Sequence, residues 1–291
     1  MSKVHELSIV LDTNAQTTPI KNGTLTDPAL KLNFTEYKPI SKAFDDMLRD
    51  QPFDVCEMAL GTFLQGLDAG KPIKLLPIVM GGEFHHGSIW YNPALGHMEP
   101  GDLKGKRVGV RAYTQTTGLW VRGVLQEQYG VPSDSVTWVT TEAPHVAEYQ
   151  CPANVELMEG AKLVDMVRTG ELAAVIQGSK QGGPEGLDHL IPNLDDAITV
   201  WYNKHKTVPV NHMVVVRGDV DDEAVQAIYN LLVKGLELAY PVAERGERFA
   251  LRNGVENVWK SVELCMLYSL EQKLTSRVFA KDEIFHPSFL G

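Results

Sequence analysis

The chain has 291 residues, of which 44% are hydrophobic and 22% charged, a globular composition with enough length for two hydrophobic cores. Acidic residues outnumber basic ones by 37 to 27, giving a net charge of −10, and no run of Lys or Arg could follow a phosphate backbone. Nor does any segment approach the roughly 20 apolar residues of a bilayer span. Nucleic acid and membrane are therefore not expected partners.

The first apolar segment, residues 7–11, is interrupted by Ser8 and is too brief for the core of a secretory signal. Cys56, Cys151 and Cys265 are odd in number and far apart, and no two form a CxxC pair. Neither a disulfide framework nor a thiolate zinc site is indicated. We therefore expect a cytoplasmic protein with reduced, buried cysteines.

Short runs rich in β-branched and aromatic residues alternate with helical patterns, which is typical of the α/β class. The expected strands are 5–11, 32–37, 53–57, 73–79, 88–91, 107–110, 136–139, 173–176, 197–201 and 212–216. The expected helices between them are 41–49, 116–129 and 162–168.

The helix at 116–129 has the strongest signals. Trp120 and Val124 form an apolar pair spaced by four residues, threonines at the start can cap the helix, and Gly130 can end it. Arg122 lies more than one turn inside this helix, where an arginine is more often an ion-pair or packing residue than a ligand contact.

The last third is almost wholly helical in pattern, at 221–240, 243–252 and 262–277. Such a tail cannot form a third sheet, so we expect it to pack on the first lobe. Lobe I would then comprise residues 1–100 and 205–291, and lobe II, residues 101–204, would be inserted into it. The polar, Gly- and Pro-containing segments 100–106 and 203–209 would be the hinge crossings, with a ligand cleft between the lobes.

Four segments of the chain carry a family resemblance. Residues 102–110 (DLKGKRVGV) are similar to the start of the second lobe of type II periplasmic-binding-protein folds. Residues 116–130 (TTGLWVRGVLQEQYG), 53–58 (FDVCEM) and 211–217 (NHMVVVR) resemble the 4,5-dihydroxyphthalate decarboxylase family. This resemblance runs through most of the chain.

The resemblance implies a two-lobed α/β fold and a non-oxidative decarboxylation of 4,5-dihydroxyphthalate, giving protocatechuate and CO2, with no cofactor. Because a fold does not fix a function, two alternatives stay open. One is a non-catalytic cytoplasmic solute-binding protein for a small carboxylate. The other is a pyrimidine synthase of the thiamine-biosynthesis type, which we rank last because the chain lacks the Cys-rich motif of those proteins.

Polar residues after the strand at 107–110 form a candidate carboxylate clamp. Ligands of open α/β sheets bind beyond the carboxyl ends of strands and near helix N-termini. The candidate substrate-binding residues there are Arg111, Tyr113, Gln115, Thr116 and Thr117. Arg can hold a carboxylate with two parallel hydrogen bonds. The alternative is that Arg111 is a surface residue and the threonines only cap the helix.

Histidines are the candidates for proton transfer, because imidazole titrates near neutral pH. His212 begins an apolar strand just beyond a proposed hinge, and His85 and His86 precede another strand. Adjacent residues of an extended chain point in opposite directions, so we favour His86 of that pair. A buried structural histidine is the alternative for each. The segment 83–86 matches no metal-binding spacing, and no metal is expected.

Three further candidates follow other strands: Asp12, Glu57 and Gln177. The two carboxylates would repel an anionic substrate unless they accept hydrogen bonds from its hydroxyl groups. The expected catalytic residues are thus His212, His86 and Glu57, and Asp12 and Gln177 join the clamp in binding a small anionic aromatic substrate. The sequence leaves the oligomeric state open, a homo-oligomer included.

Overall fold

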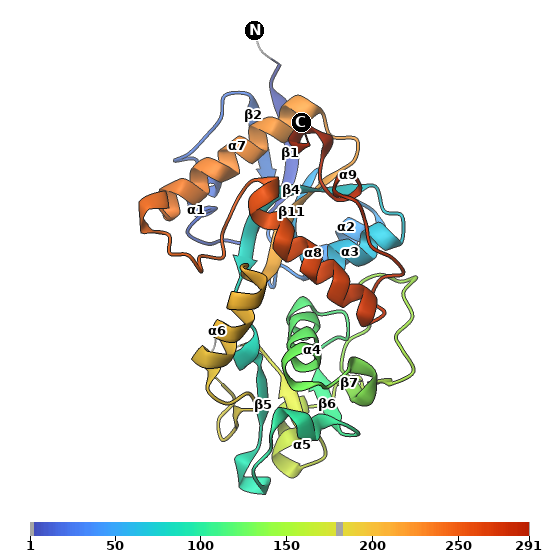
Figure 1. Ribbon diagram of the computed structural model, residues 1–291. Helices are drawn as coiled ribbons and strands as arrows, with labels where there is room; N and C mark the ends of the chain where they lie inside the picture. Colours follow the sequence, from blue (N-terminus) through green and yellow to red (C-terminus); the bar gives the residue numbers. More distant parts are fainter. Residues whose placement is uncertain (1–2, 179–182, 291) are drawn as a thin grey trace.

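The computed structural model describes residues 3–178 and 183–290 and has two lobes, each built on one β-sheet (Figure 1). The first-lobe sheet has the order β2-β1-β3-β11-β4, and the second has the order β10-β5-β9-β6-β7-β8. The strands of the first sheet are β1 (His5–Val10), β2 (Leu30–Phe34), β3 (Val55–Ala59), β4 (Ile73–Gly82) and β11 (Val210–Arg217). Those of the second are β5 (Ile89–Tyr91), β6 (Arg107–Val110), β7 (Thr137–Thr140), β8 (Val155–Leu157), β9 (Ala174–Ile176) and β10 (Asp188–His189).

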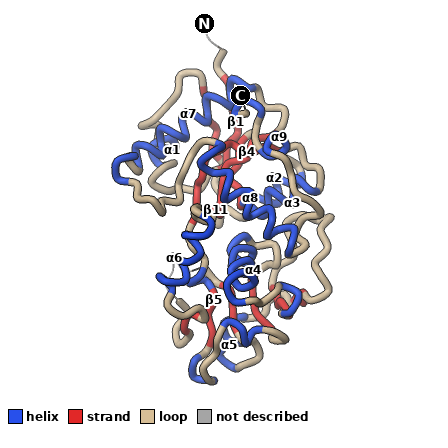
Figure 2. Tube along the Cα trace, in the orientation of Figure 1, coloured by secondary structure: helices blue, strands red, loops and turns tan. Residues whose placement is uncertain are grey.

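Helices cover both faces of the first sheet, and Figure 2 shows the strands enclosed between them. One face packs on α1 (Thr18–Lys21) and α7 (Asp222–Ala239), and the other on α2 (Lys42–Arg49), α3 (Leu60–Asp68) and α8 (Val255–Glu271). The remaining helices are α4 (Thr116–Tyr129), α5 (Leu163–Thr169), α6 (Leu194–His205) and α9 (Lys281–Ile284). None of the helices in the described part of the chain is both long and apolar enough to cross a bilayer.

The expected α/β architecture is confirmed, and the boundary at which the chain enters lobe II lies earlier than expected. Strand β5 pairs with β9 in the second sheet, so the chain enters lobe II between β4 and β5, at residues 83–88, and not at 100–106. The return crossing, at residues 206–209, lies within the expected hinge. The two crossings touch, because the Glu83 backbone N–H donates to the Pro209 carbonyl at 3.1 Å.

Two expected elements differ from the structure. Residues 197–201 belong to α6 and are not a strand, because Trp201 packs against the rings of Trp120 and Phe84, a tertiary contact that outweighs the β-propensity of the segment. In the segment 243–252, only a 3-10 turn at Val242–Glu244 forms. The tail is otherwise helical as expected, with α7 and α8 packed on β4.

One hydrophobic core joins the lobes. Its buried residues include Phe63 of α3 and Cys265 of α8 in lobe I, together with Trp120 of α4 and Trp138 of β7 in lobe II. Helix α4 therefore packs against the first lobe as well as against its own sheet.

Candidate active site

The strand directions bring two sheet edges face to face. In lobe I, β1, β3 and β4 end at the same edge, and the antiparallel strand β11 begins there. In lobe II, β6, β7 and β9 end together, beside the start of β5. Because the chain passes from the end of β4 to the start of β5, these two edges face one another across the junction of the lobes (Figure 1).

The edge of lobe I carries a hydrogen-bonded carboxylate and imidazole. Glu57 Oε1 lies 2.7 Å from His212 Nδ1, and Glu57 Oε2 accepts a hydrogen bond from the Asp12 backbone N–H at 3.0 Å. The Glu57 side chain is only 4% exposed, whereas that of His212 is 28% exposed. With Nδ1 turned to the carboxylate, Nε2 is the imidazole nitrogen that a ligand can reach.

Local pairing explains why these side chains meet. His212 is paired with Ala59 and Val214 with Glu57 across the β3–β11 ladder, which makes Glu57 and His212 diagonal neighbours. The register between β11 and β4 shifts at His212, so the strand is irregular where the imidazole emerges. The Phe44 ring of α2 then packs edge-on against the imidazole, with centroids 5.6 Å apart.

The edge of lobe II carries a cavity of about 480 Å³ whose lining residues all belong to that lobe. Its size is in the range of sites for small organic ligands. The lining residues are Arg111, Gln115, Thr141, Ala161, Lys162, Leu163, Val164, Asp165, Val175, Ile176, Gln177 and Gly178. Of the residues expected to bind substrate, the structure thus gathers Arg111, Gln115 and Gln177 here.

The polar groups of this cavity suit an anion with a polar ring. The Arg111 guanidinium is 40% exposed and pairs with Glu142 at 3.0 Å, so it is oriented but not enclosed. Gln115 Oε1 is buried and has no hydrogen-bond partner among the described residues. It could accept a hydrogen bond from a ligand.

The two threonines that follow Gln115 do not line the cavity, and Thr116 joins the lobes. Thr116 Oγ1 accepts a hydrogen bond at 3.1 Å from the Gly61 backbone N–H, at the start of α3 in lobe I. Gly61 comes two residues after Ala59, the strand partner of His212. The start of α4, next to the cavity, is thereby held against the edge that carries Glu57 and His212. Thr117 is buried.

Tyr113 and Asp12 do not line the cavity. Tyr113 is buried, and its hydroxyl donates to the Gln272 carbonyl and contacts Ser133 Oγ, both at 3.0 Å. The Asp12 side chain is exposed at the edge of lobe I and accepts a hydrogen bond from the Thr13 backbone N–H. Its backbone, as described above, holds Glu57.

His86 is far from this site. It is fully buried beside the C-terminal half of α4, where His86 Nε2 lies 2.9 Å from Gln128 Oε1. Gln128 is twelve residues beyond Thr116, or about 18 Å along the helix axis. The expectation that His86 reaches the cleft is therefore wrong. His85 is buried in the first crossing segment, with His85 Nε2 2.5 Å from Asn211 Oδ1.

The buried His86 predicts a loss of stability in acid. Burial lowers the pKa of His86 from its usual 6.5 to about 4, so between these pH values the unfolded chain binds a proton that the folded protein does not. The free energy of unfolding is therefore highest above pH 6.5, where both states leave this histidine neutral. It falls by up to about 3 kcal/mol as the pH drops to 4. Urea unfolding over this pH range measures the effect. The free energy of unfolding should depend less on pH in His86→Gln than in the wild type.

His97→Gln is the matched control, because the His97 side chain is 75% exposed. In this control, the free energy of unfolding should depend on pH as steeply as in the wild type. An equal slope in His86→Gln and the wild type would contradict the prediction.

His145 approaches the site from lobe II, and the sequence gives no sign of it. It lies in the loop after β7, where His145 Nδ1 is 2.5 Å from Asp45 Oδ1 of α2. Its ring also packs edge-on against Phe44, at 5.9 Å between centroids. Phe44 thus contacts one imidazole from each lobe.

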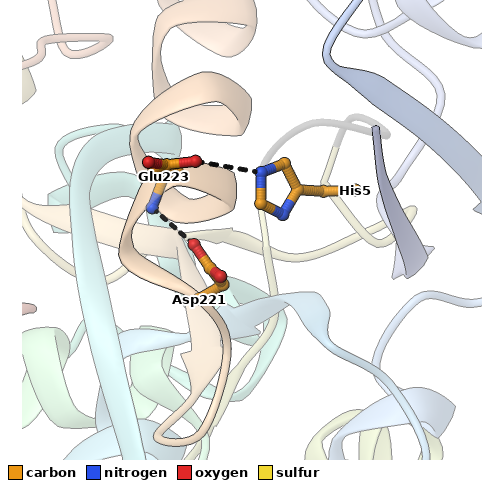
Figure 3. A group of neighbouring side chains, drawn as sticks. All are labelled: His5, Asp221 and Glu223. Carbon is orange, nitrogen blue, oxygen red and sulfur yellow. Dashed lines mark hydrogen bonds and ion pairs between the residues drawn. The ribbon is translucent and has the colours of Figure 1, made fainter. Parts of the chain in front are cut away.

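One group of metal-binding side chain types occurs among the described residues, formed by His5, Asp221 and Glu223 (Figure 3). Asp221 already caps α7 by accepting a hydrogen bond from the Glu223 backbone N–H at 2.9 Å, and it pairs with Lys3 at 2.8 Å. His5 begins β1, about 20 Å from Asp12 at the other end of that strand. The group is therefore no part of the candidate site.

Two relatives are similar in sequence over most of this chain. The chain is 29% identical over 261 residues to a 4,5-dihydroxyphthalate decarboxylase of Comamonas testosteroni, covering 84% of this chain and 77% of that protein. It is 30% identical over 221 residues to one of Pseudomonas putida, covering 69% of this chain and 83% of that protein. No protein-family model matches the chain.

Solved structures confirm the expected fold. The periplasmic aliphatic sulphonate-binding protein SsuA of Escherichia coli matches with a TM-score of 0.60 at 13% identity, covering 97% of this chain and 92% of that one. The desulfurization enzyme DSZB matches with a TM-score of 0.58 at 15% identity, covering 98% and 97%. The fold is that of periplasmic binding proteins, and by sequence the chain belongs to the 4,5-dihydroxyphthalate decarboxylase family.

Proposed function

We propose that the chain is a decarboxylase that converts 4,5-dihydroxyphthalate into protocatechuate and CO2, and that it works in the cytoplasm. The observation that carries the proposal is the Glu57–His212 pair at the edge facing the anion cavity. A receptor that only binds a carboxylate needs the cavity of Arg111 but no acid–base pair. The names of the two relatives support the same substrate.

The charges of the two edges orient the substrate. The edge of lobe I is acidic, with Asp12 and Glu57, and the cavity of lobe II contains Arg111 and Lys162. Arg111 holds the carboxylate that the product keeps, since a guanidinium binds carboxylate with two hydrogen bonds. The exposed Asp12 carboxylate accepts a hydrogen bond from a ring hydroxyl.

Each carboxyl group of the substrate is para to a hydroxyl, which allows its ring carbon to accept a proton. His212 donates the proton from Nε2 to the carbon that carries the departing carboxylate. The para hydroxyl delocalises the positive charge of the protonated ring. The carbon–carboxylate bond then breaks, its electron pair restores the aromatic ring, and CO2 leaves. Solvent returns a proton to His212.

Glu57 supports this step without touching the substrate. Its buried carboxylate accepts the hydrogen bond of His212 Nδ1–H, which fixes the tautomer and stabilises the imidazolium. Approach of the lobes would exclude water and strengthen each of these interactions.

Incubation of the purified protein with 4,5-dihydroxyphthalate tests the proposal, with CO2 and protocatechuate measured together. Release of both in equal amounts is expected. Saturable binding by calorimetry without CO2 release would replace the decarboxylase by a receptor. Phthalate, which has no hydroxyl groups, should bind but release no CO2.

A further inference from the structure

We infer that Lys162 is a second cation for the carboxylate that the product keeps, and that it acts with Arg111. The inference rests on the proposed function and names a residue that determines which substrates that site accepts. Lys162 directly precedes α5 and lines the same cavity as Arg111, which follows β6.

The positions of α5 and β6 are fixed by close packing. A Cβ on Gly109 of β6 would lie 3.2 Å from Leu163 Cβ and 3.0 Å from Leu172 Cδ1. A side chain at position 109 would crowd both leucines, so the glycine favours the close approach of α5 to the sheet. Lys162, which precedes Leu163, is thereby held near the carboxyl end of β6. Arg111 directly follows that strand and lines the same cavity.

The other charged residues that line the cavity already have ion-pair partners, whereas the Lys162 amine does not pair with any described carboxylate. Arg111 is paired with Glu142 at 3.0 Å, and Asp165, the cavity's acidic lining residue, is paired with Arg168 at 2.9 Å. Within the described part of the chain, no carboxylate lies within ion-pair distance of the Lys162 amine. The exposed Lys162 amine is thus available to a ligand, and an anion in the cavity would complete its charge pairing.

The chemistry of the reaction assigns this cation to the retained carboxylate. A cation that held the departing carboxylate would stabilise the ground state and oppose the loss of CO2. A cation on the retained carboxylate contributes equally before and after the reaction. Lys162 should therefore set KM and the affinity for product, and not kcat.

The test compares protocatechuate with 3,4-dihydroxybenzamide, which has the same ring and hydroxyl groups but no charge. Calorimetry on the wild type should show tighter binding of the acid. In Lys162→Met, which keeps most of the apolar stem, the preference for the acid should fall by about tenfold or more, because a charge-assisted hydrogen bond is lost. Binding of the amide should be unchanged, and kcat for 4,5-dihydroxyphthalate should stay within about twofold of wild type.

Lys104→Met is the matched control, since Lys104 is an exposed lysine of the same lobe that does not line the cavity. An unchanged preference in Lys162→Met, or an equal loss of affinity for acid and amide, would overturn the inference. It would also be overturned if the wild type did not prefer the acid. Failure of the proposed function would look different: no CO2 would form, while the preference for the acid and its dependence on Lys162 would persist.

Discussion

Replacing His212 with glutamine should lower kcat by roughly 10²- to 10⁴-fold, the usual contribution of a positioned acid or base. Glutamine can still hydrogen-bond to Glu57 but cannot deliver a proton. Because Arg111 and the cavity are untouched, the dissociation constant of protocatechuate should change by less than about threefold. Single-turnover CO2 release and calorimetric titration of the product measure the two quantities.

The His86→Gln variant distinguishes between the two histidines that the sequence proposes as acids. His86 is buried beside Gln128, so its loss should leave kcat near the wild-type value at pH 7.5. Full activity of His212→Gln would remove the Glu57–His212 pair from the mechanism. Equal losses in both variants would show that the effect is not specific to the site.

Replacing Arg122 with methionine should lower the free energy of unfolding by about 3 to 5 kcal/mol. The guanidinium is 1% exposed, and burial lowers its pKa. It donates at 2.7 Å both to Gln272 Oε1 of lobe I and to the Tyr113 carbonyl of lobe II, and it lies 4.1 Å from the centre of the Tyr113 ring. Methionine fills much of the volume but leaves two buried acceptors unpaired.

Urea unfolding measures this loss, with Arg168→Met as the control. Arg168 forms an exposed pair with Asp165, and removing such a pair costs about 1 kcal/mol or less. Arg122→Lys should lie between the wild type and Arg122→Met, because an ammonium group cannot copy the planar fork that reaches both acceptors. A loss in Arg122→Met no larger than in the control would contradict the prediction.

The fold is predictable where local patterns and packing agree. The strand at 107–110 and the helix at 116–129 have the same bounds in the structure, because apolar spacing and Gly130 indicate the same element. The threonines do not cap the helix as expected, since its N-cap is Gln115 and no side-chain cap hydrogen bond forms. The segment 197–201 is different. Its β-branched residues suggest a strand, but the contacts of Trp201 with Trp120 come from elsewhere in the chain. No local pattern contains that information.

Some residues of the candidate site can likewise be predicted from local patterns, and others cannot. Residues that follow parallel strands must meet at one edge, and this rule alone selects Arg111 and Gln177. The same rule could have found Thr141, which comes directly after β7. His145 and Lys162 depend on how a loop folds back and how closely a helix packs. The rule also failed for His86, because the chain enters lobe II earlier than the Gly- and Pro-containing segments suggest.

The hydrophobic core that runs from α3 and α8 into α4 has a consequence for folding. A chain with two sheets and two crossings could unfold in two steps, one for each lobe. Here the separation of lobe II would expose Trp120 and break the hydrogen bond from Arg122 Nε to Gln272 Oε1. Separation of the lobes would therefore lose apolar burial as well as polar contacts, which couples the stability of the two sheets.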